Sequence, residues 1–140
     1  MMNSGIANAL KSYGQGGKPA SVEDASPHRL VQMLMERLLE KVATAKGHMA
    51  RGNPARKGEN LSSAIAIIGG LRASLNQEAG GEIARNLDAL YEYMERRLLE
   101  ANVHNKLDYL DEVLALTKEV KSAWDVIPDA AKNTSAPNGT

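Results

Sequence analysis

Residues 82–98 read EIARNLDALYEYMERRL, and this stretch decides the fold class. When its side chains are placed around a helix at about 100° per residue, the apolar ones fall within an arc of about 120°. These apolar residues are Ile83, Ala84, Leu87, Leu90, Tyr91, Met94 and Leu98. Charged side chains occupy most of the remaining circumference. The pattern predicts an amphipathic helix with one buried side.

The residues on either side of this stretch predict where the helix begins and ends. Gly80 and Gly81 precede it, and glycine adopts left-handed backbone angles at little cost, so we expect a break there. The helix should then run over about residues 81–101. Asn105, with Asp108 three residues later, resembles a capping box and predicts a further helix over about 106–126.

Two helix starts upstream share one pattern, a polar cap followed by proline. They are Ser26-Pro27 and Asn53-Pro54. The cap's side-chain oxygen can accept from an unpaired amide, and proline at the first helical position needs no amide partner. We therefore expect helices over about residues 27–50 and 54–77.

Four helices of roughly 20 residues, each about 30 Å long, joined by short loops, are typical of one compact domain. We predict an all-α fold, an antiparallel up-down four-helix bundle spanning residues 26–128. Residues 1–25 and 129–140 are rich in small and polar residues. We expect a mobile, flexible N-terminal arm and a disordered tail, respectively.

Composition excludes several classes of protein. Seventeen Lys and Arg balance seventeen Asp and Glu, so no net field attracts nucleic acid or an anionic membrane. The chain has no cysteine, which excludes disulfides and thiolate chemistry. No signal peptide is recognisable, and no run approaches the roughly 20 apolar residues that span a bilayer. We expect a cytoplasmic protein.

Catalytic and cofactor motifs are absent from the sequence. His28, His48 and His104 share no metal-ligand spacing, and there is no Glu-x-x-His of the kind that di-metal bundles use. No Gly-x-Ser-x-Gly nucleophile motif or phosphate-binding loop occurs. We expect no enzyme activity, no catalytic residue, no cofactor and no metal.

Two helices carry more apolar or uncharged surface than one buried side requires. Between Leu61 and Gln77 the only charge is Arg72, and the face opposite the large apolar residues carries only small ones. The apolar residues of 106–126 spread over about 200°. Either these helices lie deep in the bundle, or their surfaces receive an amphipathic helix from a partner. The second hypothesis names as contact residues Ala66, Ile67, Gly70, Leu71, Ser74, Val113, Leu116 and Val120.

Four segments in series resemble the flagellar secretion chaperones of the FliS family. They are ASPHRLVQML (25–34), AIAIIGGLRASL (64–75), GGEIARNL with LYEYM (80–87 and 90–94), and LLEAN (98–102) followed by Val113-Leu114 and Ala123-Trp124. The match covers about residues 10–127.

The resemblance implies a four-helix bundle without enzyme activity or cofactor. Such a chaperone binds the C-terminal segment of newly made flagellin in the cytoplasm, prevents premature polymerisation, and delivers flagellin to the membrane export gate of the flagellar type III system. It also implies that Tyr13, in the N-terminal arm, acts as a lid that the client displaces.

Two alternatives come from other classes of protein. A self-associating structural bundle with no client would use the small-residue face for a homodimer, and it predicts a dimer at low micromolar concentration. A metal-dependent bundle enzyme predicts bound metal in the purified protein.

Overall fold

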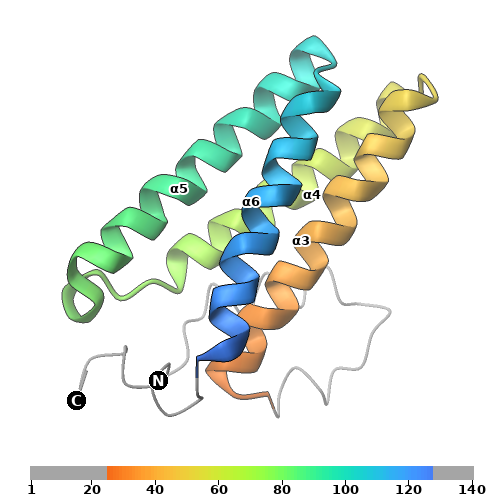
Figure 1. Ribbon diagram of the computed structural model, residues 1–140. Coiled ribbons are helices and arrows are strands. Elements are labelled where there is room, and N and C mark those ends of the chain that lie inside the picture. The colour runs from red at the N-terminus through yellow and green to blue at the C-terminus, as the bar shows by residue number, and fades with distance from the viewer. Residues whose placement is uncertain (1–24, 128–140) are drawn as a thin grey trace.

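The computed structural model describes residues 25–127, with the side chains of residues 77–79 excepted. Its helices are α3 (Pro27–Ala50), α4 (Pro54–Ala73), α5 (Gln77–His104) and α6 (Leu107–Val126), and the described part of the chain contains no strand. Helix α3 packs against α4 and α6, and α5 packs against the same two helices. Residues 25–127 therefore form a four-helix bundle, which confirms the predicted fold class (Figure 1).

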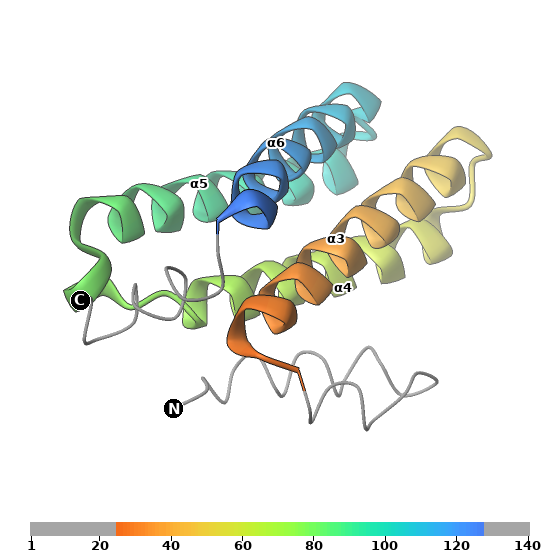
Figure 2. The same ribbon diagram turned by 60° about the horizontal axis from the view of Figure 1, so that its bottom comes forward.

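The bundle has two distinct ends. The turn end holds the α3–α4 loop (residues 51–53) and the α5–α6 turn (residues 105–106), and the terminal end holds the start of α3, the end of α6 and the α4–α5 connection (residues 74–76). Figure 2 shows α5 and α6 lying over α3 and α4. The expected N-terminal arm, except Ala25, and the expected tail lie outside the described residues.

The two proline-led helix starts have the local structure that their sequences predict. The Ser26 hydroxyl accepts from the backbone amide of Arg29 at 3.1 Å, and the Asn53 side chain accepts from the amide of Arg56 at 3.4 Å. Each cap satisfies one of the amides that a helix start leaves without a partner.

The ends of α4 and α5 differ from the expected boundaries. Helix α4 ends at Ala73, four residues early, because the Ser74 hydroxyl and amide both donate to the carbonyl of Leu71 and close the last turn. Helix α5 begins at Gln77, and the glycine break lies inside it as a kink at Gly81, with φ 55° and ψ −130°. Side chains rarely tolerate that conformation, so glycine is required at Gly81.

The start of α6 also differs from its prediction. Asn105 is not the cap, since Lys106 occupies that position and makes no side-chain cap hydrogen bond. Instead, Asn105 ends α5 with a positive φ of 53°, and its side-chain oxygen accepts from the ammonium of Lys57 at 2.6 Å. Lys57 is buried and also donates to the carbonyl of Asn102 at 3.0 Å, where a cation complements the negative end of the α5 dipole.

The core runs the length of the bundle between the four helices. Its largest fully buried side chains are Leu30, Leu34, Met35, Leu38, Val42, Leu61, Ile67, Ile68, Leu71, Met94, Leu98 and Leu110. Ile83, which belongs to the expected buried stripe of α5, lies outside this core. Ile83 is 72% exposed, because it lies at the edge of that stripe, two residues after the Gly81 kink.

Candidate functional site

The structure divides the eight predicted contact residues between core and surface. Ile67, Gly70, Leu71 and Val113 are buried, and the three apolar side chains among them belong to the bundle core. Ser74, Leu116 and Val120 are half-buried, and Ala66 is exposed. Tyr13 lies outside the described residues. Of the described contact residues, Ala66, Ser74, Leu116 and Val120 are therefore the ones accessible to a partner.

The outward face of α4 carries small residues that are open to solvent. Ser62, Ala66 and Ala73 are exposed, and Gly69 on the same face is half-exposed. A Cβ added at Gly69 would meet no heavy atom within 4 Å. These residues recur at intervals of three and four, so they form one continuous face, the small-residue face, against which another helix could pack closely.

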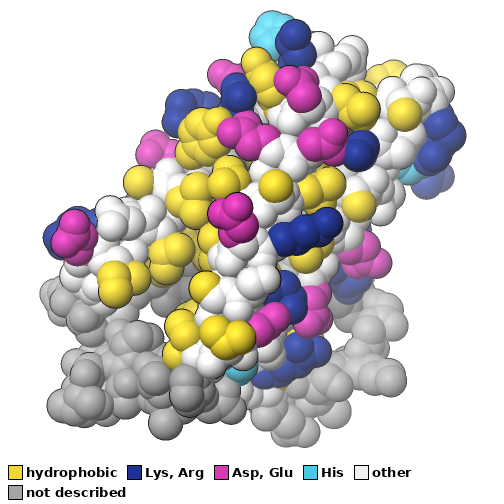
Figure 3. Space-filling view, in the orientation of Figure 1, with side chains coloured by type: hydrophobic (Ala, Val, Ile, Leu, Met, Phe, Trp, Pro, Cys, Tyr) yellow, Lys and Arg dark blue, Asp and Glu magenta, His cyan; other side chains and the backbone are white. Residues whose placement is uncertain are grey.

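A second surface lies along the boundary between α5 and α6. We call it the apolar strip, and it consists of Ile83, Leu87 and Leu90 from α5 with Leu116 and Val120 from α6. Leu87, Leu90, Leu116 and Val120 pack against the core with one side and remain half-exposed on the other. Hydrophobic side chains gather over this region in Figure 3.

The helical period places both halves of the strip on facing sides. Leu116 and Val120 follow Glu112 at intervals of four, and Leu90 and Ile83 precede Arg97 at intervals of seven. Arg97 and Glu112 contact one another across the two helices, with 2.8 Å between Nε and Oε1. The two apolar rows therefore face each other from α5 and α6.

A polar cluster closes the strip toward the turn end. The Tyr93 hydroxyl donates to Glu112 at 2.6 Å, and the Arg97 guanidinium lies 3.7 Å from the centre of the Tyr109 ring. Hydrogen bonds from Tyr93 and Arg97 lower the pKa of the Glu112 carboxyl, and the bond to Glu112 raises the pKa of Tyr93. The Glu112 carboxylate of α6 already accepts from two side chains of α5. The cluster therefore holds α5 and α6 together.

The sequence contains no direct signal for the α5 half of this strip. The apolar residues of α5 fit one buried side, and a helical wheel cannot tell which edge of that side a neighbouring helix leaves uncovered. The over-wide arc of α6 was the available signal, and Leu116 and Val120 were predicted from it.

Other kinds of site have little support in the described residues. No group of three or more His, Asp or Glu side chains in the part of the chain that the structure describes is placed to hold a metal ion. None of the helices between residues 25 and 127 is long and apolar enough to cross a membrane.

Comparison with known proteins identifies the family. The profile of the family described as flagellar protein FliS matches residues 9–131. The chain belongs to the FliS family. It is 55% identical over 119 residues to the flagellar secretion chaperone FliSB of Pseudomonas aeruginosa. The matched region covers 85% of this chain and 94% of that protein.

Further FliS relatives match over similar lengths. The flagellar secretion chaperone FliS of Vibrio cholerae is 41% identical over 131 residues, covering 94% of this chain and 96% of that protein. The flagellar secretion chaperone FliS of Salmonella typhimurium is 43% identical over 126 residues, covering 89% of this chain and 93% of that protein. The resemblance that the four sequence segments indicated is thereby confirmed.

Proposed function

We propose that this FliS-family protein is a cytoplasmic flagellar export chaperone that binds the C-terminal segment of flagellin. Binding prevents premature polymerisation, and the complex delivers flagellin to the flagellar type III export gate. Family membership supports the chaperone role, since the matched relatives are named flagellar secretion chaperones. The accessible apolar strip is the observation that supports a helical client.

The chemistry of the strip suits an amphipathic helix. Leu87, Leu90, Leu116 and Val120 are partly exposed, and Ile83 offers most of its side chain. A client helix with apolar residues at intervals of three and four could cover this row, which is the helix-in-groove mode of recognition. A client segment that folds only when bound loses conformational entropy, and this cost keeps the complex releasable at the export gate.

The small-residue face is the second contact surface in this proposal. Ala66 and Gly69 would let a client helix approach the backbone of α4 closely, and Ser74 lies at the edge of that face. Of the predicted contact residues, Ala66, Ser74, Leu116 and Val120 stay in the proposed surface. Ile67, Gly70, Leu71 and Val113 support it from below. Tyr13 remains a proposed lid.

Co-purification with the last roughly 50 residues of the cognate flagellin tests the proposal, since that segment needs no prior fold to bind. Leu90→Glu on the strip should abolish capture, and Ala89→Glu, an exposed neighbour on the solvent side of α5, should retain it. Ala66→Glu should weaken capture relative to Ala115→Glu, which is exposed on α6. Equal capture by all four variants would refute the proposed surface.

Self-association is the competing function, and the open small-residue face is the observation that favours it. Sedimentation of the chain alone at low micromolar concentration separates the two functions. We expect a monomer, or at most a weak dimer. A tight dimer that Ala66→Glu dissociates would assign that face to a second copy of the chain.

A further inference from the structure

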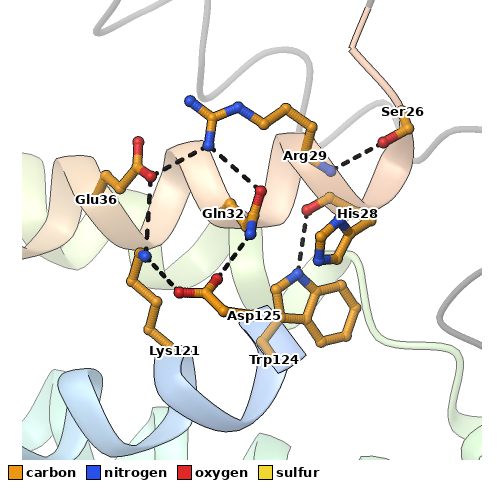
Figure 4. A network of polar contacts seen from close by, with 8 residues as sticks. All are labelled: Ser26, His28, Arg29, Gln32, Glu36, Lys121, Trp124 and Asp125. Atoms are coloured by element: carbon orange, nitrogen blue, oxygen red, sulfur yellow. Dashed lines mark hydrogen bonds and ion pairs between the residues drawn. The ribbon is translucent and has the colours of Figure 1, made fainter. Parts of the chain in front are cut away.

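Polar contacts fasten α3 to α6 at both ends of the bundle. At the terminal end, the Trp124 indole N–H donates to the carbonyl of His28 at 3.1 Å and its ring stacks on the His28 ring (Figure 4). The Asp125 carboxylate beside it accepts from Gln32 and from Lys121, each at 2.7 Å. At the turn end, the Lys46 ammonium lies 2.6 Å from the Asp111 carboxylate.

Contacts of a similar kind fasten α4 to α5. Arg72 donates from Nε and Nη2 to the two carboxylate oxygens of Asp88, at 2.8 and 3.3 Å, and from Nη1 to Glu95 at 2.9 Å. Toward the turn end, the buried Lys57 holds the last turn of α5 through its contacts with Asn102 and Asn105. The bundle thus contains two fastened pairs, α3 with α6 and α4 with α5.

The boundary between α5 and α6, unlike the two fastened pairs, has polar contacts in only one part of its length. Its polar contacts centre on Glu112, which binds Tyr93 and Arg97 near the turn end. Toward the terminal end, the apolar strip lines the boundary, and α5 and α6 separate as they leave their common turn in both Figures 1 and 2. Among neighbouring helices, α5 and α6 pack least and α3 and α4 pack most.

We propose that the bundle opens along the α5–α6 boundary at its terminal end when the client binds. Helix α6 moves with α3, and helix α5 moves with α4, about the extensive α3–α4 packing. The cost of opening is low there, since the strip residues are already half-exposed and no fastened pair has to separate. Glu112 and its partners keep the turn end closed.

This inference rests on the proposed function, because the client helix drives the opening. A ligand shifts an equilibrium between two conformations only by its difference in affinity for them. Opening would expose the covered halves of Leu87, Leu90, Leu116 and Val120, so an apolar helix contacts more surface in the open bundle than in the closed one. The client therefore favours the open bundle.

Pairs of spin labels test the movement, and the absence of native cysteine allows each pair to be placed cleanly. Asn86→Cys with Glu119→Cys reports the α5–α6 boundary from exposed positions beside the strip. The matched controls are Ala43→Cys with Lys118→Cys for α3–α6, and Ser62→Cys with Leu99→Cys for α4–α5, all exposed. Distances are measured in each labelled protein with and without the flagellin peptide.

The peptide should lengthen the Asn86–Glu119 distance by about 5 Å, half the diameter of a helix, and should leave both control distances unchanged. A bismaleimide bridge across Cys substitutions at 86 and 119 should abolish peptide binding, and the same bridge in either control should not. An unchanged Asn86–Glu119 distance in a sample shown to bind peptide would overturn the opening alone. Failure of the unlabelled chain to bind peptide would overturn the proposed function as well.

Discussion

The Arg72 guanidinium makes the most sharply testable contribution to the fold. Its contacts with Asp88 and Glu95 join α4 to α5, and the three side chains are 31%, 33% and 20% exposed. Hydrogen bonds to charged groups contribute about 1.5–3 kcal/mol each when shielded, whereas exposed ion pairs contribute about 0–1 kcal/mol. At one-third exposure or less, we expect Arg72→Met to lower the free energy of unfolding by about 2 kcal/mol.

The pH dependence of this loss identifies its cause. Hydrogen bonding to Arg72 lowers the pKa of Asp88, so this pair stabilises the fold above the unfolded pKa of about 4. That stability is lost as the pH falls through the folded pKa. In Arg72→Met the Asp88 carboxylate lacks its cation, and its protonation removes an uncompensated charge. The difference in stability between the two proteins should therefore shrink as the pH falls below about 4.

Urea denaturation followed by circular dichroism at several values between pH 7 and pH 3 measures this difference. Arg37→Met, which breaks an exposed contact with Glu40 within α3, serves as the control and should change stability by less than about 1 kcal/mol. A loss in Arg72→Met that stays constant over the whole pH range would mean that packing, and not charge, explains the role of Arg72.

The remaining predictions concern backbone and capping positions. Gly69→Ala should raise the free energy of unfolding by up to about 1 kcal/mol, because nothing meets the added Cβ, whereas Gly81→Ala should lower it by at least about 1 kcal/mol at φ 55°. Opposite signs in thermal melts of this pair would confirm the reasoning, and two losses of equal size would contradict it. Lys57→Met should lower the free energy of unfolding by about 1–3 kcal/mol in the same assay, because it leaves the Asn102 carbonyl and the Asn105 side chain without their donor. A Lys57→Met protein as stable as the wild type would show that the buried ammonium does not cap α5.

The order of helices and the fold class could be predicted from the sequence because their signals are local. Ser26-Pro27 and Asn53-Pro54 specify helix starts through capping geometry within one turn. The residues after Ala73 were harder, since Leu75 continues the apolar period although Ser74 has already closed the helix. Asn105 was misassigned as a cap, because its actual partner, Lys57, lies 48 residues away in the sequence.

The accessible surface could be predicted only in part, because it depends on how helices pair. The exposure of Ala66 on α4 agrees with the second of the two hypotheses for this helix, since an arc without large apolar residues has little to bury. Ile67 and Leu71, about 100° and 140° away from Ala66 around the helix, pack into the core. The α5 half of the apolar strip was not predicted, because a helical wheel does not show which edge of the buried side a neighbouring helix leaves uncovered.

Methyl-resonance NMR of the chain with the flagellin peptide tests the central proposal most directly. Titration should shift the methyl signals of Ile83, Leu87, Leu90, Leu116 and Val120, and should leave those of Val42, a core residue in the half of α3 nearer the turn end, nearly unchanged. Saturation with no shift in the five strip residues, or shifts confined to α3, would contradict the assignment of the α5–α6 apolar strip as the client-binding surface.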